Sequence, residues 1–163
     1  MKQKRFLKTA LLFAFTALMA VHGSSEGDYY DYYAVYMDRE NLERSVFYVD
    51  TGKEITNPGK IYYARQYIYV NEKYKGVHVI DNSSPEKPVK QGFIMAPGCI
   101  DMAVKGDIMY LDNAVDLVSF DLIGRKETSR IKKVFPELEH PRGYIRYYED
   151  RPENLILVEW VKR

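Results

Sequence analysis

The side chains that could carry out catalysis or hold a metal ion are few and scattered. Downstream of residue 23 the chain has two histidines, His78 and His140, and a single cysteine, Cys99. A zinc site needs three or four converging ligands, and no second histidine or cysteine lies at ligand spacing from His78. Cys99 has no evident histidine partner that would make it a catalytic nucleophile. We therefore expect no catalytic residue, no metal and no cofactor, and we predict that the protein is not an enzyme.

Carboxylates are the other candidates for chemistry. Asp101, Asp107, Asp112 and Asp116 lie close together in the sequence, but they lack the alternating D-x-D-x-D spacing of a calcium loop. We predict that these four side chains are solvated turn residues. Because acidic residues occur throughout the chain, a carboxylate-dependent hydrolase or lyase is the alternative to a non-enzymatic role.

The cysteine and the tyrosines have structural interpretations. Cys99 is interpreted as a small buried residue, with a free thiol or an intermolecular partner as the alternative. The strand tyrosines are expected to pack rather than to form a platform for sugars, because aromatic residues are enriched in strands. These tyrosines are Tyr62, Tyr63, Tyr67 and Tyr69.

One segment of the chain occurs twice, about forty residues apart. Each copy is a pair of apolar strands closed by an aspartate, Asp81 in the first copy and Asp121 in the second. We interpret both aspartates as caps of the repeat, whose carboxylates accept hydrogen bonds from the following turn. The paired strands are 68–71 with 76–81, and 109–112 with 116–121.

Alternation and turn residues extend each copy to a four-stranded unit, which is typical of propeller blades. The predicted fold is all-β: an incomplete β-propeller of two blades, about 60–95 and 100–135, and a remnant of a third, 141–163. A short helix is expected near 38–45, because Asp38 is a good N-cap. The predicted strands are 46–49, 60–64, 67–71, 77–81, 89–95, 100–104, 108–111, 117–121, 130–135, 144–148 and 155–161.

The N-terminal segment predicts export. Four basic residues precede the uncharged, apolar run 9–21, which is typical of the helix of a signal peptide. Thirteen residues are too few to span a bilayer, which takes about 20. We expect cleavage after Gly23, with Ala20 as the second choice, and a Tyr-rich acidic spacer over 24–37. Without the first 23 residues the chain carries 20 Lys and Arg against 23 Asp and Glu, a net charge of −3, which argues against nucleic acid as a partner.

The two units resemble the LVIVD-repeat proteins of bacterial envelopes. The resemblance covers about residues 37–135, and it implies a β-propeller of the cell surface without an assigned activity. This chain differs from those proteins in being far shorter and in lacking a cysteine directly after the signal, so no lipid anchor is expected. The similar segments are 59–62, 67–72 and 74–82 in the first unit, and 101–106 and 116–121 in the second.

These observations lead to one expected function and its alternatives. We predict an exported protein of the periplasm, cell surface or extracellular space that serves as a non-enzymatic binding or scaffold module. Open blade edges would bind a second copy or another envelope protein, because unpaired strand edges invite pairing. The turns Asn71–Lys75 and Asp112–Val115 are the expected contact surface for a protein or glycan. A truncated product without independent function is a further alternative.

Overall fold

The computed structural model describes residues 31–143 and 151–163. The predicted signal peptide, its cleavage site at Gly23 or Ala20, and the predicted strand 144–148 lie outside these residues. Within them the chain forms eleven strands and one short helix, so the all-β prediction is confirmed. The strands form three antiparallel sheets, and none of the three, as far as the described residues show, closes on itself.

The first unit of the repeat forms a five-stranded sheet in the order β2-β6-β5-β4-β3. Four of its strands follow one another along the chain as a meander, which confirms the strands predicted for 60–95. β2 adds a fifth strand beside β6, and the sequence did not predict this pairing. The strands are β2 (Phe47–Val49), β3 (Pro58–Ala64), β4 (Tyr67–Glu72), β5 (Gly76–Asp81) and β6 (Val89–Met95).

The second unit forms a four-stranded sheet in the order β10-β9-β8-β7. Its last strand was predicted at 130–135 and instead begins at Lys126. The chain reverses direction in a tight turn directly after Asp121, so β10 begins earlier than predicted. Val134 and Phe135 are not part of the strand, because their backbone N–H groups donate hydrogen bonds to Val115 O. The strands are β7 (Met102–Lys105), β8 (Ile108–Asn113), β9 (Asp116–Asp121) and β10 (Lys126–Ile131).

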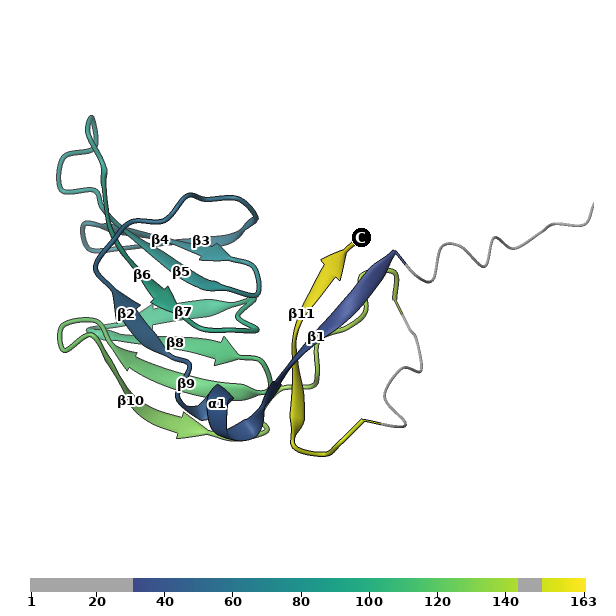
Figure 1. Ribbon diagram of the computed structural model, residues 1–163. Helices are drawn as coiled ribbons and strands as arrows, with labels where there is room; N and C mark the ends of the chain where they lie inside the picture. The colour runs from purple at the N-terminus through teal and green to yellow at the C-terminus, as the bar shows by residue number, and fades with distance from the viewer. Residues whose placement is uncertain (1–30, 144–150) are drawn as a thin grey trace, which may run out of the picture.

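A third sheet joins the two ends of the described chain. β1 (Tyr32–Asp38) pairs with β11 (Leu155–Lys162), so part of the predicted spacer 24–37 is a strand. The predicted remnant 141–163 supplies β11 to this two-stranded sheet and not to a third four-stranded unit. Figure 1 shows the two larger sheets on one side of the molecule and the β1–β11 sheet beyond their ends.

The β1–β11 sheet is held by apolar side chains on both of its faces. Val35 and Met37 pack with Ile156 and Val158 against Leu42 and the β8–β9 turn. Leu157 and Trp160 pack with Leu138 and with Tyr32 and Tyr36 of β1. The spacer interpretation is wrong for residues 32–37, because their partner strand lies more than a hundred residues away, where no local pattern reveals it.

The predicted helix is confirmed as α1 (Arg39–Glu43), which follows β1 directly. Asp38 is its N-cap, and Asp38 Oδ1 accepts a hydrogen bond from Asn41 N at 2.9 Å. Leu42 is its fully buried residue, so the helix lies on the surface and contributes one side chain to the interior.

The main core lies between the two larger sheets. Strand side chains alternate between faces, and the facing positions of both sheets are apolar. β3 lies beside β7 and β2 lies beside β10, so the sheets stack with corresponding edges together. The buried residues of this core are Val46, Tyr69, Val77, Val79, Ile94, Ala96, Cys99, Met102, Met109, Leu111, Val118 and Phe120.

The outer face of the five-stranded sheet is covered by the β2–β3 loop, residues 50–57. Glu72 accepts hydrogen bonds from the Thr56 hydroxyl at 2.6 Å and from backbone N–H groups of the loop. Lys53 Nζ lies 4.6 Å from the centroid of the Phe93 ring, and Phe93 is only 1% exposed. The loop therefore covers this face around Phe93, whereas Ile61 and Tyr63 on β3 stay exposed.

Candidate functional site

The second unit has an open face, which is the side of the four-stranded sheet away from the core. Met109 and Leu111 point into the core, so Tyr110 between them points outward. By the same alternation Ala103 on β7 and Ser119 on β9 point outward. Tyr110 is 38% exposed although it is a large aromatic residue in a central strand.

Strand register arranges the open face in cross-strand rows, because paired residues of antiparallel strands share a face. The central row pairs Tyr110 with Ala103 on one side and Ser119 on the other, and Ser119 pairs with Ser129. Small side chains therefore flank the Tyr110 ring, which projects from a shallow surface. We call these four residues the Tyr110 row.

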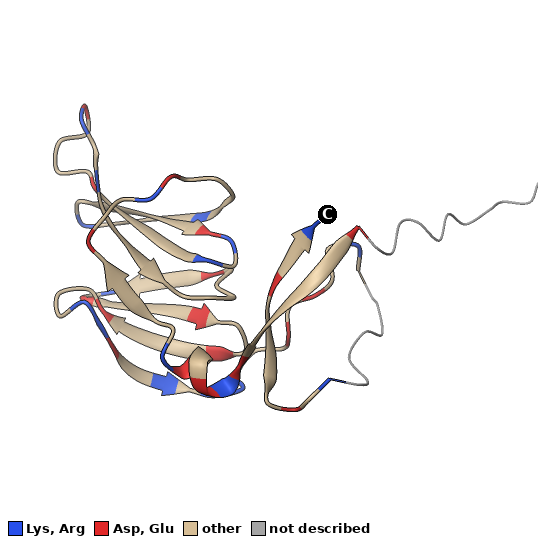
Figure 2. Cartoon of the chain, viewed as in Figure 1, with Lys and Arg blue, Asp and Glu red and all other residues tan. Residues whose placement is uncertain are grey.

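The two ends of the open face differ in charge. At the turn end, Asp121 lies between Lys126 and Ile108, and Ile108 pairs with Lys105. At the end toward the β1–β11 sheet, Leu117 pairs with Asp112 and with Ile131. The acidic ends of β8 and β9 face the β1–β11 sheet in Figure 2. One end of the face is thus basic and the other is acidic.

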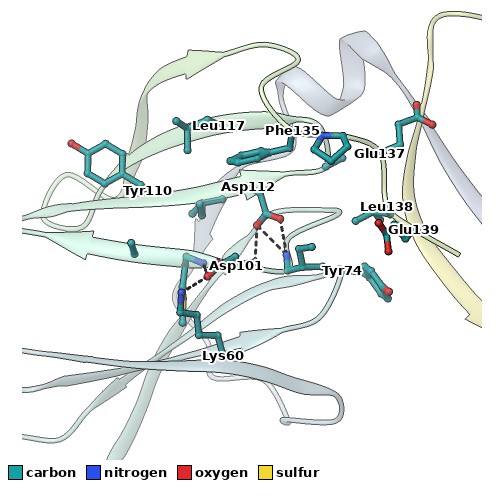
Figure 3. A pocket seen from close by; sticks show the side chains of 16 residues that line it. Lys60, Tyr74, Asp101, Tyr110, Asp112, Leu117, Phe135, Glu137, Leu138 and Glu139 are labelled. Carbon is teal, nitrogen blue, oxygen red and sulfur yellow. Dashed lines mark hydrogen bonds and ion pairs between the residues drawn. The ribbon is translucent and has the colours of Figure 1, made fainter. Parts of the chain in front are cut away.

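A groove of about 640 Å³ lies at the acidic end, between the open face and the segment 135–139. Figure 3 shows Phe135 and Leu138 on the segment and Tyr74 on the β4–β5 turn around this groove. Glu137 and Glu139 add carboxylates to its wall. Glu137 forms an ion pair with Arg151, which ties the segment to the start of the C-terminal described range.

Two aspartates of the groove hold its floor in place. Asp112 accepts hydrogen bonds from Ile100 N at 3.0 Å and Asp101 N at 2.9 Å (Figure 3). Burial raises the pKa of Asp112 in spite of these N–H donors. Asp101 forms an ion pair with Lys60 at 2.6 Å, which joins the segment before β7 to β3. Both carboxylates therefore fix the residues that lead into β7, Asp112 by its hydrogen bonds and Asp101 by its ion pair with Lys60.

Asp116 is the buried centre of an ionic cluster. Asp116 Oδ2 lies 2.6 Å from Arg39 Nη1 and 3.0 Å from Arg130 Nη1, and Oδ1 accepts from Lys133 N at 3.0 Å. Burial opposes the charge of Asp116, but hydrogen bonds from Lys133, Arg130 and Arg39 outweigh it and lower its pKa. The prediction of solvated turn residues is wrong for Asp112 and Asp116, which are 7% and 0% exposed.

The two histidines lie in different parts of the interior. His78 Nε2 lies 2.9 Å from Glu72 Oε2. Burial opposes the charge of Glu72, but hydrogen bonds from Thr56 and His78 lower its pKa to about 2. His140 packs edge-on against Trp160, and burial lowers its pKa. Within 31–143 and 151–163, no three His, Cys, Asp or Glu side chains are grouped as a metal site would require.

Cys99 lies in the main core. Its side chain is fully buried, and Asn71 Nδ2 lies 3.3 Å from its Sγ. Burial raises the pKa of the thiol well above its usual range, so the reactive thiolate is not formed at neutral pH. Of the two interpretations, the small buried residue describes this environment.

The two cap aspartates lie at the start of equivalent turns. Asp81 Oδ1 accepts a hydrogen bond from Ser83 N at 2.8 Å. Asp121 Oδ1 accepts from Ile123 N at 2.9 Å and Gly124 N at 3.0 Å. These bonds lower the pKa of both carboxylates. Each aspartate is thus part of an Asx turn that closes a strand of its unit.

The turns expected to form the contact surface are mostly buried. All four residues of Asp112–Val115 are buried, and in Asn71–Lys75 both Asn71 and Glu72 are buried. The β1–β11 sheet packs on these turns, so the expectation of an open surface is wrong for Asp112–Val115, whereas Lys73 and Lys75 of the other turn are exposed. The open face was not predicted, because alternation places Tyr110 opposite Met109 and Leu111 but does not show that no sheet covers its side.

Comparison of the chain with protein-family models, curated proteins and solved structures found no match. The resemblance to the LVIVD-repeat proteins therefore stays a prediction. None of the helices in the described ranges has the length and apolar character needed to cross a membrane. The open face and its groove are the candidate site on which the functional argument depends.

Proposed function

We propose that the protein is an exported scaffold module of the bacterial envelope that associates with a second copy through the open face. Its two larger sheets are two propeller-type blades, as in the LVIVD-repeat proteins it resembles. Two features support the blade assignment: each unit is a four-stranded meander, and the two stack with corresponding edges together. The basic and apolar residues at 1–23 support export.

The observation that carries the proposal is the unequal burial of two equivalent tyrosines. Tyr69 and Tyr110 occupy the same position in the two copies of the repeat. Tyr69 is 4% exposed because its face packs on the four-stranded sheet, whereas Tyr110 is 38% exposed. The open face of the second unit thus corresponds to a face that the first unit buries against another sheet. Apolar strand surface of this kind is stabilised when a partner covers it.

A second copy fits the open face better in one orientation than in any other. Head-to-tail stacking would place the open face on the outer face of the first unit, where the loop 50–57 already covers the surface around Phe93 and Glu72. Two open faces can instead meet about a two-fold axis parallel to the Tyr110 row. The basic end of one copy, at Lys105 and Lys126, would then face the acidic end of the other, at Glu137 and Glu139. Isologous contacts of this kind are the commonest in homo-oligomers.

Sedimentation velocity of the chain from residue 24 onward tests the proposal. The expected result is a monomer–dimer equilibrium that shifts toward monomer as salt is added, because exposed charges are screened. Tyr110→Glu should abolish the dimer, since it places a charge at the centre of the contact. Tyr63→Glu is the matched control, because Tyr63 is an exposed tyrosine of β3 that lies outside the open face.

Two outcomes would contradict self-association. One is a monomer at every protein concentration, which would leave another envelope protein as the partner to be sought. The other is a dimer that Tyr110→Glu leaves intact.

A further inference from the structure

A second hollow, of about 240 Å³, lies between the two larger sheets at the end away from β1–β11. The β3–β4, β7–β8 and β9–β10 turns surround its mouth. They contribute Arg65, Asp107 and Arg125, while β2 and β4 contribute tyrosines to its wall. This cleft is separate from the groove on the open face, so ligand binding in it does not depend on self-association.

Tyrosine rings form one wall of the cleft. Tyr48, Tyr67 and Tyr69 all line it, and the Tyr67 and Tyr69 ring centroids lie 6.2 Å apart. Burial raises the pKa of Tyr69 to about 12 and also raises that of Tyr48. Both hydroxyls therefore stay protonated at neutral pH and can donate hydrogen bonds. Flat rings with hydroxyl donors suit a ligand that has both apolar and hydroxylated edges.

One of these hydroxyls has no partner. Tyr48 Oη is buried, and the described residues offer it no hydrogen bond. A buried hydroxyl without a partner destabilises the protein by about 1–3 kcal/mol. A ligand group that forms a hydrogen bond with it removes this penalty, and binding is stronger by that amount than at an exposed hydroxyl. The Tyr48 ring reaches this position because residue 92 is glycine: a Cβ there would lie 2.2 Å from Tyr48 Oη.

A β-bulge adds an amide to the same wall. The register of β5 and β6 shifts between Val79 and Ile80, so that Gln91 has no partner across the ladder. Gln91 lines the cleft. β-Bulges change the direction of side chains and are frequent beside binding sites, and this bulge is at the residue that lines the cleft.

The mouth of the cleft carries an excess of positive charge. Arg65 forms an ion pair with Asp107 at 2.6 Å, which bridges the turns of the two sheets. Arg125 lies 4.5 Å from the Tyr48 ring centroid and forms an ion pair with Asp50 outside the cleft. Two guanidinium groups and one carboxylate therefore line the cleft. A guanidinium has five N–H donors, so each arginine keeps donors for an anion after forming its ion pair.

We propose that this cleft binds a small hydroxylated acid, a ring of the size of one sugar that carries a carboxylate. The carboxylate would lie between Arg65 and Arg125, and the ring would lie against Tyr67 and Tyr69 with a hydroxyl on Tyr48. The volume supports this size, because pockets for larger ligands measure about 300–1,000 Å³. The residues on this wall were expected only to pack, and the cleft gives two of them a second role.

Isothermal titration calorimetry of the purified protein with sodium glucuronate tests the proposal, with glucose and inorganic phosphate as the comparison ligands. We expect glucuronate to bind with a Kd at least tenfold lower than that of glucose, because charged hydrogen bonds contribute about 1.5–3 kcal/mol. Phosphate should bind more weakly than glucuronate, since it cannot contact the tyrosine wall.

Two variants separate binding from folding. Arg125→Gln should weaken glucuronate binding about tenfold. Arg44→Gln, which removes an exposed ion pair with Glu40 far from the cleft, should leave glucuronate binding unchanged. Tyr48→Phe removes only the unpartnered hydroxyl, so it should weaken binding about fivefold without lowering the stability of the protein.

Four results would overturn the inference. They are no saturable binding of glucuronate, equal affinity for glucose and glucuronate, phosphate binding as tight as that of glucuronate, and unchanged binding in Arg125→Gln. If the Tyr48 hydroxyl were only structural, Tyr48→Phe would change the stability of the protein and leave the Kd for glucuronate unchanged.

Discussion

The two units of the repeat share a sequence pattern and differ in what covers them. Tyr69 in the first unit is enclosed between two sheets, and Tyr110 at the same position of the second unit lies on an open surface. The difference does not come from either tyrosine or its strand, since both strands alternate in the same way. It comes from the order of the sheets, because the first unit has a neighbour on that side and the second has none among the described residues.

The opposite faces of the two units differ as well. Val118 in the second unit packs on the first sheet, whereas His78 at the same repeat position lies under the loop 50–57. His78 contacts Glu72, and Glu72 holds Thr56 of that loop. A polar pair thus replaces an apolar contact where a loop replaces a sheet. One repeat pattern therefore accommodates a sheet, a loop or solvent as its neighbour.

Replacing each of the two tyrosines by alanine should give the largest difference in stability between the units. Tyr69→Ala should lower the free energy of unfolding by about 3–5 kcal/mol, as expected for a large buried aromatic residue. Tyr110→Ala should cost about 1 kcal/mol or less at protein concentrations at which the chain is monomeric. Urea unfolding followed by circular dichroism measures both. Equal losses would show that the two environments are not different.

The stability of the second unit should depend on the carboxylate of Asp116. The first unit has no such contact, because Gly76 occupies the equivalent position of the repeat. Asp116→Ala leaves Arg39 and Arg130 without their buried carboxylate, and we expect a loss of about 3 kcal/mol in the free energy of unfolding. Asp101→Ala is the control, because its ion pair with Lys60 is exposed and should be worth at most about 1 kcal/mol. Similar losses in the two variants would argue against the buried cluster.

The first unit should carry the larger share of the acid sensitivity. The pKa of Glu72 is about 2 in the folded protein, below its ordinary value of 4.5, so the fold favours its carboxylate. That stabilisation is present above about pH 4.5 and is lost as the pH falls toward about 2. Glu72→Gln should therefore lower stability at neutral pH by on the order of 2 kcal/mol.

The measurement is urea unfolding of the wild-type protein and Glu72→Gln over this pH range. The difference between them should shrink as the pH falls, because the wild-type carboxylate becomes protonated. A difference that does not change with pH would mean that the charge of Glu72 has no part in holding the loop.

The smallest expected effect concerns the two cap aspartates. Asp121 accepts two backbone hydrogen bonds and Asp81 accepts one, so Asp121→Ala should lower the melting temperature more than Asp81→Ala. Both side chains are only partly buried, and both shifts should be small. Differential scanning calorimetry of the two variants gives the order, and a larger shift for Asp81→Ala would contradict it.

Local patterns predicted most of the strands. Alternation and turn residues gave β3 to β9 to within two residues, and β6 without error, because each strand pairs with its neighbour in sequence. The strand predicted at 130–135 was displaced because Val134 and Phe135 look like strand residues, but their N–H groups bond to the β8–β9 turn. A local pattern does not show which distant acceptor a backbone group finds.

The candidate site was less predictable because it depends on long-range contacts. Asp112 and Asp116 look like ordinary turn aspartates, and they are buried only because the segment 135–139, the β1–β11 sheet and α1 pack nearby. The pairing of β1 with β11 spans almost the whole described chain. The exposure of Tyr110 likewise depends on which sheets are present beside it, and its own strand gives no sign of this.

Cross-linking at Ser119 tests the central claim most directly. Ser119 belongs to the Tyr110 row, which lies along the proposed two-fold axis, and packed sheets are about 10 Å apart. Cys99 is buried and should not react, so Ser119→Cys offers a single accessible thiol. A short bis-maleimide should give a covalent dimer of Ser119→Cys and leave Tyr63→Cys monomeric. A monomeric Ser119→Cys, or equal cross-linking of both variants, would contradict the assignment of the open face as the contact between two copies.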